Sequence, residues 1–440
     1  MANPSTIAHT RTEGSSPLGN PWLQLFIGVI CMACVANLQY GWTLFINPID
    51  AKYHWGRASI QVAFTIFVVI ETWLIPVEGY LVDRFGPRWV VIGGGFLIAM
   101  AWVLNSYADS LSMLYVGAAL GGIGTGCVYG TCVGNALKWF PGRRGLAAGI
   151  TAAGFGIGAI VTIAPIAAMI GKAGYQHAFF VFGLLQGSII FVMAWLLLAP
   201  PASLVAAAVK PNQTTRGYSP SEVLRSPVFY VLYLMFVLIA TGGLTMTASM
   251  APIAKDLKID SVAVQLLGFS APALVFALSL NRAFDGFGRP FFGWLSDQIG
   301  REYTMALAFF IGAASLFILS QSGSNPVVFV LVTALYFGVY GEIFSLFPAT
   351  QGDTFGSKFA ASNAGMLYTA KGAGALFVSP ATAFAQAHGW GVVLAAFMTF
   401  NVIAGLMALF LLKPMRKRHF ANNREALRTA TQTVSETRAT

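Results

Sequence analysis

The chain has 440 residues, of which 56% are hydrophobic and only 10% are charged. Soluble proteins carry about 25% charged residues, so this composition excludes a soluble globular domain and predicts an integral membrane protein. The formal net charge of +10 would suit nucleic-acid binding in a soluble chain. In a membrane protein the placement of basic residues in loops matters more, and we expect no nucleic-acid partner.

Apolar segments of about 20 residues, the length that crosses a bilayer, follow one another along the chain. The first 20 residues are polar and lack the pattern of a signal peptide. The first six predicted transmembrane helices cover residues 22–48, 59–81, 89–107, 111–136, 146–169 and 177–199. The second six cover residues 227–251, 263–293, 303–321, 325–348, 362–386 and 390–412. The predicted fold class is therefore an all-α membrane protein with twelve transmembrane helices in two six-helix bundles.

The stretch between the two sets contains Pro, Ser and Thr and is polar enough to be a linker. The predicted division of the chain is an N-terminal tail (1–21), an N-terminal bundle (22–199), a linker (200–226), a C-terminal bundle (227–412) and a C-terminal tail (413–440). With both termini on one side, that side holds 18 of the 26 Lys and Arg residues. Because loops rich in Lys and Arg stay inside, we expect both termini and the linker to be cytoplasmic.

The two predicted bundles repeat a short motif. "GYLVDRFGPR" (79–88) follows the second predicted helix, and "GWLSDQIGRE" (293–302) follows the eighth. Internal symmetry of this kind is typical of transporters whose two halves rock around a central site. Glycine allows such loops to be tight, while acidic and basic residues in them can form ion pairs between helix ends. The residues that we expect in these roles are Gly79, Asp83, Arg84, Gly293, Asp297 and Arg301. The pattern resembles the major facilitator superfamily.

Six ionisable residues lie inside the predicted helices, where a charge is costly and a functional role is the default hypothesis. They are Glu71, Arg282, Asp285, Arg289, Glu342 and Lys371. Arg289 lies eight residues before Asp297, which is about 12 Å along a helix and near the middle of the bilayer. Lys371 lies at a similar depth, so two cations of the C-terminal bundle predict an anion site.

Asp285 bears on this site because it can pair with Arg282 at i−3 or with Arg289 at i+4. We expect Arg282 to be its partner, which leaves Arg289 free for a substrate. The roles of Glu71, Asp285 and Glu342 stay open between structural pairing and proton transfer.

Aromatic residues occur near the same depth, and their rings would shrink a cavity and exclude water from it. Those we expect to line the site are Tyr40, Tyr129, Phe155, Tyr340, Phe344 and Tyr368.

A narrower resemblance rests on four stretches. They are "ANLQYGWTLF" (36–45), "KWFPGRRGLAAGITAAGFGIG" (138–158), "GRPFFGWLSDQIGR" (288–301) and "GMLYTAKG" (365–372). Together they resemble the oxalate:formate antiporter branch of the superfamily. The resemblance implies that Arg289 and Lys371 bind a dicarboxylate, that the six aromatic residues line the pocket, and that Gln39 is a polar pocket residue.

The expected function is therefore exchange of oxalate for formate by alternating access. An empty pocket with two bare cations would be costly to close, whereas a dianion would neutralise it, so exchange would be obligatory. If Glu342 or Asp285 reaches the pocket instead, the empty pocket neutralises itself, and proton-coupled uptake of a mono- or dicarboxylate becomes the alternative.

The predicted helices contain no nucleophile–base pair and no metal-ligand spacing, so we expect neither an enzyme, nor a metal site, nor a cofactor. We expect a protein that works as a monomer, with small carboxylate anions and the lipid bilayer as its partners. The family resemblance implies a multi-pass protein of the cell inner membrane.

Overall fold

The computed structural model describes residues 17–201, 217–266, 268–356 and 359–422. In these ranges, nine helices are long and apolar enough to cross a membrane, and the bent pair α4–α5 adds a tenth. Two predicted segments are not among these ten: the eighth, which contains the charged helix α13, and the eleventh, which is divided between α17 and α18. Each predicted segment is thus largely helical, while the count of twelve membrane crossings stays a prediction.

The first half of the chain contains only helices in its described part. They are η1 (Pro17–Gly19), α1 (Pro21–Val35), α2 (Asn37–Tyr40), α3 (Thr43–Tyr53), α4 (Arg57–Trp73), α5 (Ile75–Phe85), α6 (Pro87–Ser106), α7 (Leu111–Trp139), α8 (Arg144–Ala173) and α9 (Tyr175–Leu196). Several begin at a proline, whose fixed φ suits the first helical position, where its missing N–H would have no partner.

The second half adds one hairpin to its helices. Its elements are α11 (Pro220–Leu224), α12 (Pro227–Asp256), β1 (Ala263–Leu266), β2 (Phe269–Pro272), α13 (Ala273–Ile299), α14 (Arg301–Ser322), α15 (Pro326–Tyr340), α16 (Ile343–Phe355), α17 (Ala360–Ala375), α18 (Val378–His388), α19 (Trp390–Met407) and the π-helical turn η2 (Ala408–Leu412). The linker and C-terminal-tail predictions fall partly on residues 202–216 and 423–440, which lie outside the described residues.

The hairpin corrects one prediction, because residues 263–272 were expected to open the eighth transmembrane helix. They form two antiparallel strands instead, with Ala263 opposite Pro272 and Leu266 opposite Phe269. Gly268 has φ +82°, a conformation that favours a tight turn over a helix. The helix therefore begins only at Ala273.

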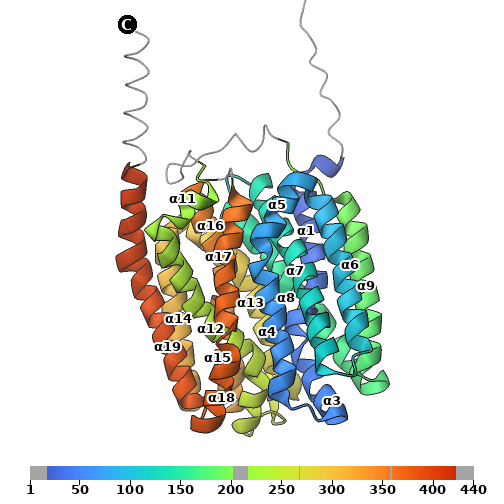
Figure 1. The fold of residues 1–440 in the computed structure, drawn as a ribbon. Helices are drawn as coiled ribbons and strands as arrows, with labels where there is room; N and C mark the ends of the chain where they lie inside the picture. Colours follow the sequence, from blue (N-terminus) through green and yellow to red (C-terminus); the bar gives the residue numbers. More distant parts are fainter. Residues whose placement is uncertain (1–16, 202–216, 267, 357–358, 423–440) are drawn as a thin grey trace, which may run out of the picture.

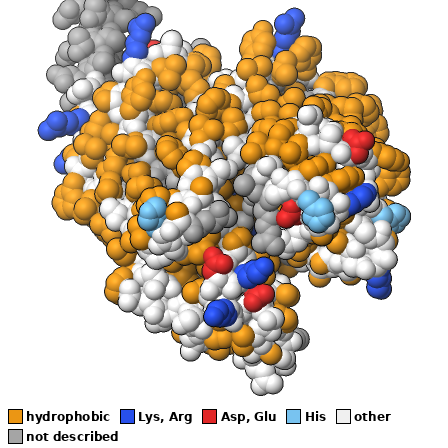
Figure 2. Space-filling model, turned by 60° about the horizontal axis from the view of Figure 1, so that its bottom comes forward, with side chains coloured by type: hydrophobic (Ala, Val, Ile, Leu, Met, Phe, Trp, Pro, Cys, Tyr) orange, Lys and Arg blue, Asp and Glu red, His pale blue; other side chains and the backbone are white. Residues whose placement is uncertain are grey.

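The two halves lie side by side, with α6 and α9 at one edge and α14 and α19 at the other, and both ends of the described chain lie at the same end of the molecule (Figure 1). Apolar side chains cover most of the visible flanks, while charged side chains and histidines gather on the end opposite the termini (Figure 2). This distribution suits a molecule whose flanks face lipid.

Glycines bring the halves into contact. A Cβ added to Gly156 of α8 would lie 2.8 Å from the Gly286 Cα of α13, and one on Gly365 of α17 would lie 2.8 Å from Ile75 of α5. These crossings bring the backbones of the two bundles close together on both sides of the centre.

Candidate functional site

Lys371 lies at the contact between the two halves, on α17. Its Nζ is 2.9 Å and 3.0 Å from the two carboxylate oxygens of Glu71, which belongs to α4 of the first half. Nζ also donates to Gln39 Oε1 at 3.1 Å and lies 3.5 Å from the Tyr368 hydroxyl. Lys371 is 2% exposed and Glu71 is fully buried, so this is a buried ion pair between the bundles.

Aromatic rings surround the ammonium group of Lys371. Four of the six predicted aromatic residues have ring centroids between 5.3 and 6.0 Å from Nζ, namely Tyr129, Phe155, Phe344 and Tyr368. Rings at such distances attract a cation through their negative faces. The structure thus brings these residues together around the lysine that the sequence singled out.

Arg289 is the second buried cation and is 1% exposed. Its Nη2 donates to the Tyr40 hydroxyl and to Asp285 Oδ2, each at 2.8 Å, and its Nη1 donates to the Ala152 carbonyl at 2.7 Å. Tyr40 in turn donates to the same Asp285 oxygen at 2.9 Å. Tyr40 and Ala152 come from the first half, so this network also crosses between the bundles.

The expected partner of Asp285 was wrong. Its Oδ2 is 2.8 Å from Arg289 Nη2 but 4.0 Å from Arg282 Nη1. Arg282 instead lies over the rings of Tyr40 and Phe337, with its guanidinium carbon 4.1 Å and 4.7 Å from the two centroids. The i+4 position of Arg289 gives the closer contact, and the Tyr40 hydroxyl holds the carboxylate there.

The supposition of two bare cations was wrong as well, because each cation has a carboxylate partner in this conformation. The sequence singled out Glu71 as a buried acid but not as the partner of Lys371, although a lysine inside a membrane helix is expected to pair with an acid. That expectation does not say which of the three acids takes the role. The Ala152 carbonyl and Phe337 were missed, since an apolar residue next to a cation has no distinctive sequence pattern.

Phe344 connects the two cations. Its ring centroid is 4.5 Å from the guanidinium carbon of Arg289 and 5.7 Å from the ammonium nitrogen of Lys371. Both cations thus contact one aromatic ring near the centre of the molecule. Because the ring attracts positive charge, it brings the two cations together without neutralising either.

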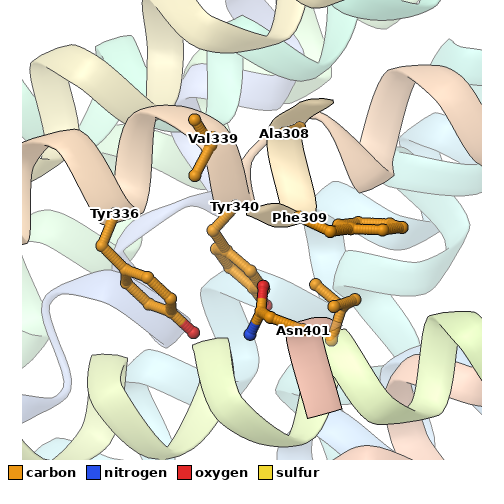
Figure 3. Close-up of a pocket in the computed structure, with 7 residues that line it drawn as sticks. Ala308, Phe309, Tyr336, Val339, Tyr340 and Asn401 are labelled. Carbon is orange, nitrogen blue, oxygen red and sulfur yellow. The ribbon is translucent and has the colours of Figure 1, made fainter. Parts of the chain in front are cut away.

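Tyr340 has a different environment. Its hydroxyl has no hydrogen-bond partner among the described residues, and its ring lines a small pocket inside the second half beside Tyr336 and Asn401 (Figure 3). The Tyr340 and Phe344 rings lie edge to face, with centroids 5.7 Å apart. Tyr340 therefore packs between this small pocket and Phe344, and its hydroxyl is not hydrogen-bonded to either cation.

Glu342 lies where the tenth predicted helix is interrupted, between α15 and α16. It is fully buried, and neither carboxylate oxygen has a hydrogen-bond partner among the described residues. The structure thus places it in the helix break next to Gly341, whose own neighbours are Asp285 and Arg289.

The repeated motif forms a charge network in the second half. Arg301 is 2.7 Å from Asp297 and 3.0 Å from Asp353, and a Cβ on Gly293 would lie 2.6 Å from the Gly145 carbonyl of α8. In the first half, Arg84 is exposed with its guanidinium carbon 5.5 Å from the Phe85 ring. Gly79 is buried, and the side chain of Asp83 lies outside the described part of the structure.

Residues 25–379 match the Major Facilitator Superfamily. The chain belongs to this superfamily. The fold prediction is confirmed at this level, and the superfamily consists of transporters and not of enzymes. Among curated relatives, the oxalate:formate antiporter of Oxalobacter formigenes is 33% identical over 417 residues, which cover 94% of this chain and 96% of that protein. The resemblance to that branch of the superfamily is therefore confirmed.

Two other curated relatives have lower identity to this chain. An uncharacterized transporter of Escherichia coli K12, YhjX, is 26% identical over 81% of this chain and 86% of its own length. Monocarboxylate transporter 12-B of Danio rerio is 25% identical over 78% of this chain and 76% of its own. The names of two of these three relatives refer to carboxylate substrates.

Proposed function

We propose that this protein carries small carboxylate anions across the membrane by alternating access, and that Arg289 and Lys371 bind the anion. The observation that carries this proposal is that two buried cations contact one ring, Phe344, at the interface of the two halves. Anion sites between halves that rock are suited to transport, because either half can release its contacts when the opposite end opens. The oxalate:formate antiporter among the relatives supports oxalate and formate as first substrates to test.

Binding requires displacement, because carboxylates of the protein already occupy both cations. Glu71 lies 2.9 Å from Lys371, and Asp285 lies 2.8 Å from Arg289. A substrate carboxylate offers the same charge and the same acceptor geometry, so it competes with them for the same donors. A substrate that replaces Glu71 also breaks an ion pair that joins the two halves.

This arrangement bears on how transport is driven. Strict exchange was expected because closing around two bare cations would cost several kcal/mol per ion. With Glu71 and Asp285 in place, the empty pocket can close without that cost, and the carrier can return empty. Proton-coupled uptake is therefore the mode that the site geometry favours: a proton on Glu71 releases Lys371 for the substrate carboxylate. Obligatory exchange of oxalate for formate is the second candidate, supported by the similarity to the antiporter.

Uptake into proteoliposomes separates the two modes. Labelled oxalate or formate is supplied outside, and the vesicles contain oxalate, formate or no anion, each with and without an inward proton gradient. Uptake into anion-free vesicles that rises with the gradient supports proton coupling. Uptake that requires a preloaded anion and ignores the gradient supports obligatory exchange. Absence of uptake for both anions under every condition would contradict both candidates.

A further inference from the structure

Arg282 is a buried cation near the proposed site that the site does not use. It is 3% exposed, and its Nη1 has no hydrogen-bond partner among the described residues. The nearest carboxylate oxygen, Asp285 Oδ2, is 4.0 Å away and already accepts hydrogen bonds from Tyr40 and Arg289. Asp285 Oδ2 is therefore engaged by Tyr40 and Arg289, and Arg282 Nη1 keeps a free donor among the described residues.

The rings of Tyr40 and Phe337 hold the guanidinium group of Arg282 in a fixed position. A guanidinium packed flat on aromatic rings still directs its N–H groups outward at its edge, where they suit a carboxylate. The arrangement thus orients a charged donor without neutralising its charge.

Arg282 also lines a narrow cavity between the two halves. The cavity has room for about one water molecule in this conformation. Its lining includes Tyr40, Thr43 and Ile163 from the first half and Thr247, Leu278 and Arg282 from the second. Because both halves contribute, the cavity must widen when they separate at that end, which is the end where α3 lies, opposite the chain termini (Figure 1).

The spacing along α13 connects this cavity with the proposed site. Arg282 and Arg289 are seven residues apart on one helix, so they lie on nearly the same face and roughly 10 Å apart along the axis. Asp285 lies between them and pairs with the deeper arginine. The cluster of Arg282, Asp285, Arg289, Glu71 and Lys371 contains three cations and two carboxylates, and Arg282 is the cation without a close carboxylate.

We propose that Arg282 is an outer anion subsite, which receives the carboxylate of a substrate arriving from the α3 end before that carboxylate reaches Arg289 and Lys371. This inference rests on the proposed function, because it assumes a carboxylate substrate. It adds a second binding position that is reached first from one side only. Substrate from the α3 end passes Arg282 before the central site, whereas substrate from the opposite end reaches Arg289 and Lys371 first.

The test measures KM and kcat from each side in membrane vesicles of both orientations, sorted by protease access to a tag on the C-terminus. The probes are labelled oxalate and formate. For Arg282→Gln we expect KM from the α3 side to rise about tenfold, the lower end of what focused charge contributes to substrate capture. The rise from the opposite side should be clearly smaller. For Arg282→Lys, which keeps the charge but loses the planar fork, we expect an intermediate rise on the α3 side.

Two further variants keep the test decisive. Phe337→Leu leaves the charge in place but removes one ring of the stack, so it should raise the α3-side KM less than Arg282→Gln does. Arg289→Gln should abolish transport from both sides, which tests the proposed function itself. An equal KM change from both sides for Arg282→Gln, or no change, would overturn the outer subsite while leaving the proposed function intact. Wild-type protein that carries neither anion would overturn both.

Discussion

Lys371 of the second half and Glu71 of the first half form a buried ion pair, with Nζ and Oε2 2.9 Å apart. The pair joins α17 to α4 across the interface between the two halves, which separate in the proposed transport cycle. It neutralises a cation of the proposed anion site and at the same time stabilises one arrangement of the bundles. Under the proposed function, substrate binding and the opening of the interface act on the same contact.

Replacing Glu71 with Gln should change binding and coupling in opposite ways. Without the competing carboxylate, Lys371 is free for an anion, and we expect the dissociation constant for oxalate or formate to fall about tenfold, or ~1.4 kcal/mol. Proton-driven uptake into anion-free vesicles should be lost, because the group that takes up the proton is gone. Calorimetric titration and vesicle uptake measure the two effects. Weaker anion binding in Glu71→Gln would contradict the displacement argument.

The pair also predicts an unusual pattern of stability. Lys371→Met leaves Glu71 buried without its partner, and breaking a buried pair in this way costs about 3–5 kcal/mol. Adding Glu71→Leu removes the unpaired carboxylate, so the melting temperature in detergent should recover in the double variant. Transport should stay lost in both variants because the cation is absent. If the double variant melts as low as Lys371→Met alone, the two residues do not act as a pair.

Phe344 should affect affinity more than stability. Its ring contacts both Arg289 and Lys371, and a desolvated cation–π contact contributes about 0.5–2 kcal/mol. Phe344→Leu keeps an apolar side chain, although a smaller one, so we expect a KM increase of about two- to thirtyfold with a smaller effect on melting temperature. Tyr336→Phe, which alters a hydroxyl in the pocket behind Tyr340, serves as a control and should change KM less.

The contact between α8 and α13 should tolerate no side chain at Gly156. A Cβ there would lie 2.8 Å from the Gly286 Cα, whereas a Cβ on Gly171 of the same helix meets nothing within 4 Å. We expect Gly156→Val to reduce transport at least tenfold, because overpacking at this crossing costs about 1–3 kcal/mol and prevents close approach of the halves. Gly171→Val is the matched control. Equal activity of the two variants would show that this crossing does not have to close.

Much of this protein could be predicted from its sequence. Long apolar segments show which residues are helical in a membrane, because every backbone group must be satisfied inside the helix. The repeated motif predicts two related halves. Burying a charge is so unfavourable that Arg289 and Lys371 stand out in any apolar segment. The residues 263–272 were missed because apolarity does not distinguish a short hairpin from the start of a helix.

The tertiary structure decided which charges meet. Helix periodicity places Asp285 within reach of both Arg282 and Arg289, and only the position of Tyr40 from the other half determines that it pairs with Arg289. The pair between Lys371 and Glu71 depends on how two bundles dock, and residues 300 positions apart leave no local pattern. Local sequence determines which residues each helix carries, whereas the partner of a buried charge depends on packing between helices, and that packing occurs only in the folded chain.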